Sequence, residues 1–222
     1  MKKHHFSTLQ IITHTVVWLP LIWYIIQYNT DINPIQAFTQ RTGKTALILL
    51  VLSLSCTPVI TLFGLRQVGK IRRALGIYAL MYAGIHFFTF IGLDYGFDWT
   101  LLKGAIFEKT YILVGLSALL ILAALGATSF KYWQKRMGKN WKRLHKLVYL
   151  ASGLVILHYG WAKKGDFLRL QGDIAGPALF GLLVVFLLFM RIPAVRKWAS
   201  GLRGRLTSRA RALTRAQPEQ IL

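Results

Sequence analysis

Apolar residues in this chain fall into six long stretches, separated by short polar segments. Each stretch approaches the about 20 residues that an α-helix needs to cross the hydrocarbon core of a bilayer. Lys146 is the only charged residue inside them, and it lies near an end, where its side chain can reach the aqueous interface. The pattern predicts an all-α polytopic membrane protein with six transmembrane helices. The predicted spans are residues 10–28, 45–63, 74–93, 111–130, 144–162 and 174–190.

The composition agrees with a membrane protein, because 55% of the residues are hydrophobic and the mean hydropathy is +0.46. The connections are too short to hold a globular domain, and no nucleotide-binding fingerprint occurs. The chain is therefore expected to lack a pyridine-nucleotide or FAD domain. Cys56 is the single cysteine, which excludes an intramolecular disulfide and a Cys-ligated cluster. No internal repeat is evident.

The basic residues are distributed unequally between the two sides of the predicted bundle. One side, formed by both termini, residues 64–73 and 131–143, and Lys146, carries 21 of the 28 Lys and Arg residues. The other side, formed by residues 29–44, 94–110 and 163–173, carries seven of them and six of the seven acids. The positive-inside rule places the basic side, with both termini, in the cytoplasm. This bias accounts for the net charge of +21 without nucleic-acid binding.

The predicted transmembrane domain comprises residues 1–192, and the segment after it is basic and has no apolar stretch long enough to cross a membrane. Residues 193–222 form a basic tail in which Trp198, Leu202 and Leu206 recur every four residues and Leu213 extends the row. That spacing is typical of an amphipathic helix on an anionic inner leaflet. A disordered basic tail is the alternative, and the sequence does not decide between them.

Histidines inside the apolar stretches are the candidate functional residues, because ionisable groups are costly in lipid and usually mark function. His86 and His158 lie in the third and fifth spans, seven and four residues before their outer ends. At about 1.5 Å per residue, both lie in the outer leaflet, about 10 Å and about 6 Å from the boundary. Two imidazoles at similar depth can take the two axial positions of one heme iron. A polar helix contact or a proton relay is the alternative.

Two further histidines lie nearer the cytoplasmic side. His145 lies 13 residues before His158, about 20 Å lower and turned by about 220° on a straight helix. The matching depth at the cytoplasmic end of the third span falls near Arg72 and Arg73, so a second pair of histidine ligands is not predicted there. His145 is expected to contact a quinone headgroup or the interface, with heme ligation through another partner as an alternative. His14 is a structural contact or part of an inner quinone site.

Three clusters of residues carry a resemblance to a known family. They are residues 42–47 (TGKTAL), residues 72–76 (RRALG) followed by His86, and residues 141–150 (WKRLHKLVYL) followed by His158 and Tyr159. On these segments the chain resembles the ferric-reductase-like transmembrane superfamily. It is more closely similar to the MsrQ (YedZ) family, the heme-binding membrane subunits of the bacterial periplasmic methionine sulfoxide reductase system. The third cluster is the specific one, and the resemblance covers about residues 10–192.

The resemblance implies a heme-binding bundle in the bacterial inner membrane that takes electrons from membrane quinones. It implies a b-type heme with His86 and His158 as axial ligands of the iron, and His145 as a third site residue. It further implies a periplasmic molybdopterin methionine sulfoxide reductase of the MsrP type as the partner. A flavin mononucleotide (FMN) is also associated with the family, but no motif here places it.

Two other function classes compete with this electron-transfer role. One is the membrane half of a ferric or other metal reductase that is fed by a separate flavoprotein. The other is a transporter or structural membrane protein without heme, which the lack of membrane-embedded acids and of paired broken helices disfavours. The favoured prediction is a quinol-linked electron-transfer subunit of an oxidoreductase complex, without a catalytic domain for the final substrate.

Overall fold

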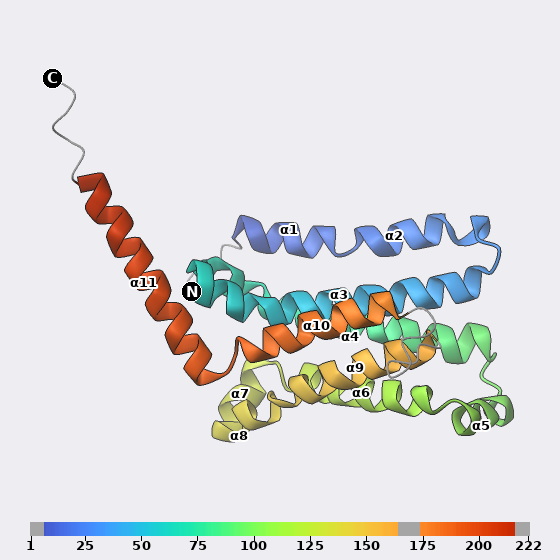
Figure 1. The fold of residues 1–222 in the computed structure, drawn as a ribbon. Coiled ribbons are helices and arrows are strands. Elements are labelled where there is room, and N and C mark those ends of the chain that lie inside the picture. Colours follow the sequence, from blue (N-terminus) through green and yellow to red (C-terminus); the bar gives the residue numbers. More distant parts are fainter. Residues whose placement is uncertain (1–6, 164–173, 216–222) are drawn as a thin grey trace.

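The computed structural model describes residues 7–163 and 174–215, and every regular element among them is helical (Figure 1). The predicted all-α class is therefore confirmed. The five longest core helices are α3 (Pro34–Phe63), α4 (Arg72–Phe88), α6 (Thr110–Ala127), α9 (Leu147–Ala162) and α10 (Ala175–Phe189). The closest pairs are α3 with α4 and α6 with α9, while α10 lies against α9 and α3.

The first predicted span is broken into α1 (Thr8–Val16) and α2 (Leu19–Ile26), with Pro20 in the first turn of α2. This broken helix lies along the outside of the bundle beside α3 and leaves most of its apolar side chains exposed (Figure 1). Hydrogen bonds hold it to the core, and two of them involve tyrosine hydroxyls, one near the break and one in α2. The Tyr82 hydroxyl donates to the Val17 carbonyl at 2.7 Å, and the hydroxyls of Tyr24 and Thr45 lie 2.8 Å apart.

Helix α3 begins at Pro34, eleven residues before the start predicted from the apolar pattern. The predicted boundary between the outer connection 29–44 and the second span was therefore wrong, because residues 34–44 belong to the same helix as the span. Asn33 caps that helix by accepting a hydrogen bond from the backbone of Gln36 at 3.2 Å, and Pro34 suits the first turn. Arg41 forms a two-point ion pair with Asp31 at 2.6 and 2.8 Å, which satisfies its charge on the outer part of the helix.

The connections contain short helices instead of open loops. On the side predicted to face outward, α4 continues into the π-helix Thr89–Asp94, which is followed by α5 (Trp99–Glu108). On the other side lie the 3-10 helix Arg66–Lys70 and the helices α7 (Lys131–Met137) and α8 (Lys139–Leu144). Helix α9 begins at Leu147, so His145 lies in a turn before the helix, whereas the predicted span 144–162 places it inside the helix.

Four helices in the described part of the chain are long and apolar enough to cross a membrane. They are Thr8–Thr30, Pro34–Phe63, Arg72–Asp94 and Thr110–Ala127. Helix α10 passes the same criterion only together with the start of α11 (Pro193–Arg215), and the two helices are bent by 80°. Helix α9 has 16 residues, which is slightly short for a bilayer core. The count of six spans stays a prediction.

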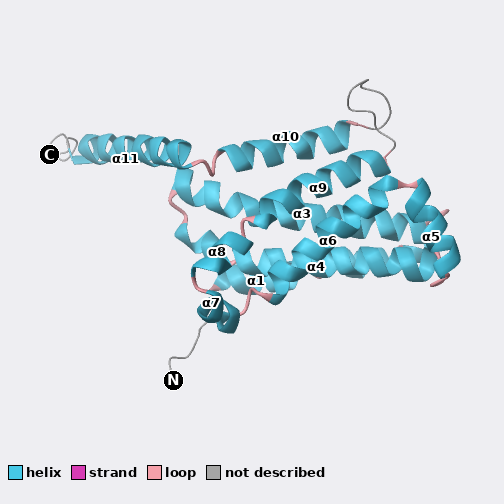
Figure 2. Ribbon diagram, turned by 90° about the horizontal axis from the view of Figure 1, so that it is seen from below, coloured by secondary structure: helices cyan, strands magenta, loops and turns pink. Residues whose placement is uncertain are grey.

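The two ends of the bundle differ in the elements that they carry. Helices α7, α8 and α11 lie at one end, and α5 lies at the other (Figures 1 and 2). The predicted outer connection 163–173 lies outside the described residues, apart from Lys163. Between the two ends, a core around Leu50, Leu54, Ala79, Tyr82 and Ala151 joins the helices.

Candidate functional site

The imidazole rings of His86 on α4 and His158 on α9 face each other across the bundle. Their ring centres are 6.0 Å apart, and the two ring planes are nearly perpendicular at 84°. Both residues are half-buried. The two histidines that the sequence places at similar depth are thus neighbours in the structure, although 72 residues separate them along the chain.

Each ring is held by a backbone carbonyl of the neighbouring helix. Nδ1 of His86 lies 2.8 Å from the carbonyl oxygen of Thr39 on α3, and Nδ1 of His158 lies 2.8 Å from that of Tyr111 on α6. Because a carbonyl oxygen only accepts, Nδ1 is the protonated nitrogen of each ring. In a neutral imidazole Nε2 then keeps its lone pair, which is the arrangement of a histidine that binds a metal through Nε2.

A glycine lies one helical turn after each carbonyl and gives the ring its space. A Cβ atom on Gly43 would lie 2.9 Å from Nδ1 of His86, and one on Gly115 would lie 2.5 Å from Nδ1 of His158. Side chains larger than hydrogen are therefore incompatible with the present ring positions. A carbonyl and a glycine together fix where each imidazole lies.

The two halves of this site are equivalent. A shift of 72 residues maps Thr39 to Tyr111, Gly43 to Gly115 and His86 to His158. The same shift aligns residues 45–47 (TAL) with 117–119 (SAL), and it aligns Ala79 with Ala151, which are both buried. This internal relationship was missed in the sequence, where few identities mark it. The recurring glycine, 43 residues before each histidine, was the available signal.

The separation of the two rings agrees with two ligands on one metal. With about 2 Å for a bond from imidazole nitrogen to metal and about 1 Å from nitrogen to ring centre, two axial imidazoles have centres about 6 Å apart. In the described part of the chain, no group of three or more His, Cys, Asp or Glu side chains could hold a bare metal ion. A heme brings four nitrogen donors of its own, so two histidines complete its coordination. The residues present therefore fit a heme.

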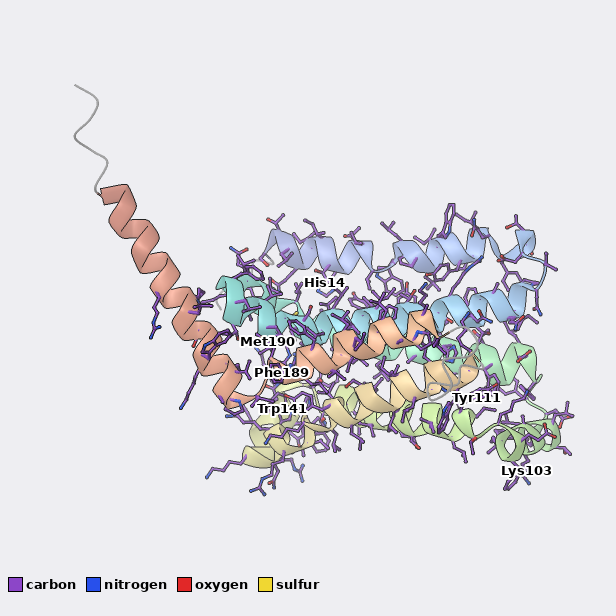
Figure 3. The ribbon with its side chains drawn as sticks, viewed as in Figure 1. His14, Lys103, Tyr111, Trp141, Phe189 and Met190 are labelled. Atoms are coloured by element: carbon purple, nitrogen blue, oxygen red, sulfur yellow. The ribbon has the colours of Figure 1, made fainter. Side chains whose placement is uncertain are left out.

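His145 is not part of this pair. Its ring stacks on Trp141 with centres 4.1 Å apart, and its Nδ1 lies 3.2 Å from the Trp141 carbonyl oxygen. Its Nε2 is buried and makes no hydrogen bond within the described residues. Figure 3 places Trp141 at the end of the bundle opposite Tyr111, whose carbonyl holds His158. His145 and the pair thus belong to opposite ends of the bundle.

His14 lies on α1, which packs against α4. Figure 3 shows it well away from Tyr111, whose carbonyl holds His158. Nδ1 of His14 lies 2.8 Å from the hydroxyl of Tyr78, and the two rings pack edge to face. Trp18 packs on the same tyrosine. This contact joins the broken outer helix to the core, so a structural role accounts for it.

Comparison with known proteins identifies relatives across most of the chain. Residues 42–156 match the family model described as "Ferric reductase like transmembrane component". A protein-methionine-sulfoxide reductase heme-binding subunit MsrQ from Rhodospirillum rubrum is 39% identical over 188 residues, which are 82% of this chain and 87% of that protein. The MsrQ of Bordetella pertussis is 32% identical over 78% of this chain and 82% of its own length. That of Herminiimonas arsenicoxydans is 38% identical over 72% of both chains.

Proposed function

The chain belongs to the MsrQ family of heme-binding subunits, and from this premise we propose that it carries electrons through one b-type heme bound by His86 and His158. The observation that carries the proposal is the separation of 6.0 Å between two imidazoles whose Nδ1 atoms are both bound to carbonyls. When bound, the heme supplies a reversible one-electron couple. The protein supplies the position and the basicity of the two ligands.

The carbonyls of Thr39 and Tyr111 act on the ligands in two ways. They fix the tautomer, so that Nε2 of each histidine has a lone pair for the metal. They also accept a hydrogen bond from Nδ1–H, which raises the basicity of Nε2 and makes it a stronger electron-pair donor to the metal. Since the carbonyls belong to α3 and α6, the packing of these helices on α4 and α9 sets the distance between the ligands.

The proposed electron acceptor is a periplasmic molybdopterin methionine sulfoxide reductase, and it docks on the outer end of the bundle. Tyr111, whose carbonyl holds His158, lies three residues after the end of α5. Helix α5 exposes Trp99, Lys103 and Phe107 at that end. A docked partner there is separated from His158 by the first turn of α6. The proposal places the protein in the bacterial inner membrane with both termini in the cytoplasm, in agreement with the excess of basic residues at the α7 end.

The proposed electron donor is a membrane quinol, bound near His145 at the opposite end. Nδ1 of His145 faces a carbonyl oxygen and carries the proton, so its buried Nε2 has an unused lone pair. Buried polar atoms without a partner are rare and need an explanation. A quinol hydroxyl donating to Nε2 provides one, and it gives His145 the role of proton acceptor. His14 is a second candidate at that end, and the FMN stays a prediction without assigned residues.

The test uses the purified full chain in lipid. A difference spectrum of the reduced minus the oxidised protein should show one low-spin b-type heme per chain. A quinol analogue should reduce it, and a periplasmic reductase of this class should reoxidise it once a methionine sulfoxide substrate is added. Reduction by a soluble cytoplasmic flavoprotein alone, with no response to quinol, would favour the metal-reductase alternative. A colourless, folded protein would contradict the heme proposal itself.

A further inference from the structure

Helix α11 leaves the bundle at a steep angle. It follows α10 after a short break, and the axes of the two helices are bent by 80° (Figures 1 and 2). If α10 runs across the bilayer with the rest of the bundle, α11 lies nearly in the plane of the membrane. It starts at the end that carries α7 and α8, the end with most of the basic residues.

The first turns of α11 are fixed to the end of α3. One guanidinium nitrogen of Arg203 donates to the carbonyls of Ile60 and Thr61 at 2.8 and 2.9 Å. These carbonyls belong to the last turn of α3, where the helix dipole is negative and favours a cation, and the Ile60 carbonyl also accepts from the backbone N–H of Gly64 at 3.0 Å. Ala199, one turn before Arg203, is 3% exposed. The direction of α11 is therefore set by the bundle and not by a free hinge.

A row of apolar side chains lies beside the face that contacts α3. Trp198 is 68% exposed and Leu202 is 45% exposed, and each directly precedes a residue of the contacting face. Successive residues are turned by about 100° on a helix, so this row borders the contact with α3. Trp198 and Leu202 are four residues apart and are therefore neighbours on the helix surface, and contiguous exposed apolar surface of this kind marks a contact with a membrane or a partner.

The charge of α11 indicates what covers the row. The helix contains seven Lys and Arg residues and no Asp or Glu between Pro193 and Arg215. Arg196 and Lys197 are exposed in its first turn. A helix with an apolar row between cations, oriented in the membrane plane, fits the boundary between acyl chains and anionic headgroups. We propose that α11 is a membrane-surface helix that binds the anionic phospholipids of the inner leaflet through Trp198, Leu202 and its exposed basic residues Arg196 and Lys197.

The test places a nitroxide label on α11 in the full-length protein. Leu202→Cys labels the apolar row, and Ser200→Cys labels the opposite face, because two residues correspond to a turn of about 200°. Cys56 is only 1% exposed and should not react. Each protein is placed in bilayers of phosphatidylcholine, with or without about one third phosphatidylglycerol, which supplies the anionic surface. Exposure of the label to oxygen and to a water-soluble nickel chelate is then measured.

In the anionic bilayer, the label at 202 should be at least several-fold less accessible to the chelate than the label at 200. Pure phosphatidylcholine should reduce that difference. Replacing Arg196 and Lys197, which are both exposed, by Gln should reduce it in the anionic bilayer, while the heme spectrum stays unchanged. Equal exposure of both labels in both bilayers would overturn the proposal. Protection of position 202 that appears only after a cytoplasmic protein fraction is added would also overturn it, and would assign the row to a protein partner.

Discussion

A Cβ atom added to Gly115 would lie 2.5 Å from Nδ1 of His158, which is closer than Cβ atoms approach other heavy atoms in real proteins. The corresponding distance from Gly43 to Nδ1 of His86 is 2.9 Å. Both rings are bound at Nδ1 to a carbonyl of the same helix that carries the glycine. A side chain at either glycine would therefore displace the ring and break its hydrogen bond.

Gly115→Ala should strongly reduce the heme bound per protein, because the added methyl group displaces His158 from its position. Gly43→Ala should have the same effect to a smaller degree, since the space beside His86 is less restricted. Gly153→Ala on α9 is the matched control, because a Cβ there meets no atom within 4 Å. Heme content is measured against protein concentration in detergent. Normal heme content in Gly115→Ala would show that the ring positions differ in the loaded protein.

His86→Ala and His158→Ala should each abolish bound heme or reduce it severely. Removing either histidine would leave the heme with one protein ligand in place of two, which weakens its binding. The spectrum and the heme content of the membrane-inserted variants are the measurement. A double variant that inserts correctly and retains a normal low-spin spectrum would exclude both residues as ligands.

Much of the site could be predicted from the sequence, because ionisable residues are conspicuous in apolar stretches. His86 and His158 are such residues, and a constant rise per residue sets their depth. The carbonyls of Thr39 and Tyr111 could not be predicted, since every residue has a carbonyl. Thr39 also lies in a segment that was interpreted as a connection.

That segment shows where the apolar pattern fails. Gln40, Arg41 and Lys44 interrupt it, so the helix is predicted to begin at residue 45. The structure continues α3 outward to Pro34, where Asp31 pairs with Arg41 and Asn33 caps the helix. Long-range pairing and local capping outweigh hydrophobicity there. The break between α1 and α2 has a local origin, since Pro20 disrupts the backbone hydrogen bonds of the preceding turn.

Cysteine labelling should determine the orientation. Lys103→Cys on α5 should react with a membrane-impermeant reagent added from the periplasm, and Lys135→Cys on α7 should react only after the membrane is opened. Both positions are exposed, and they lie at opposite ends of the bundle (Figure 1). The predicted excess of basic residues at the α7 end places that end in the cytoplasm. Labelling of position 135 from the periplasm would reverse the orientation and the proposed direction of electron flow.

His145→Ala should keep the heme and lose quinol oxidation. The heme should remain because the ring of His145 stacks on Trp141 at the end of the bundle away from the His86 and His158 pair. Quinol oxidation releases protons together with electrons, and a positioned base typically contributes about 10²–10⁴-fold to such a step. Reduction of the heme by a quinol analogue should therefore be slower by about a hundredfold. Dithionite, which needs no proton acceptor in the protein, should still reduce it fully.

Trp133→Phe on α7 is the matched control for this variant. Trp133 is an aromatic residue at the same end of the bundle, it is 40% exposed, and its replacement should leave both rates unchanged. Two results would contradict the assignment in different ways. Complete heme loss in a correctly inserted His145→Ala protein would make His145 a ligand. Unchanged quinol oxidation would mean that the buried Nε2 atom of His145 has another role and that the proton acceptor lies elsewhere, with His14 beside Tyr78 as the next residue to replace.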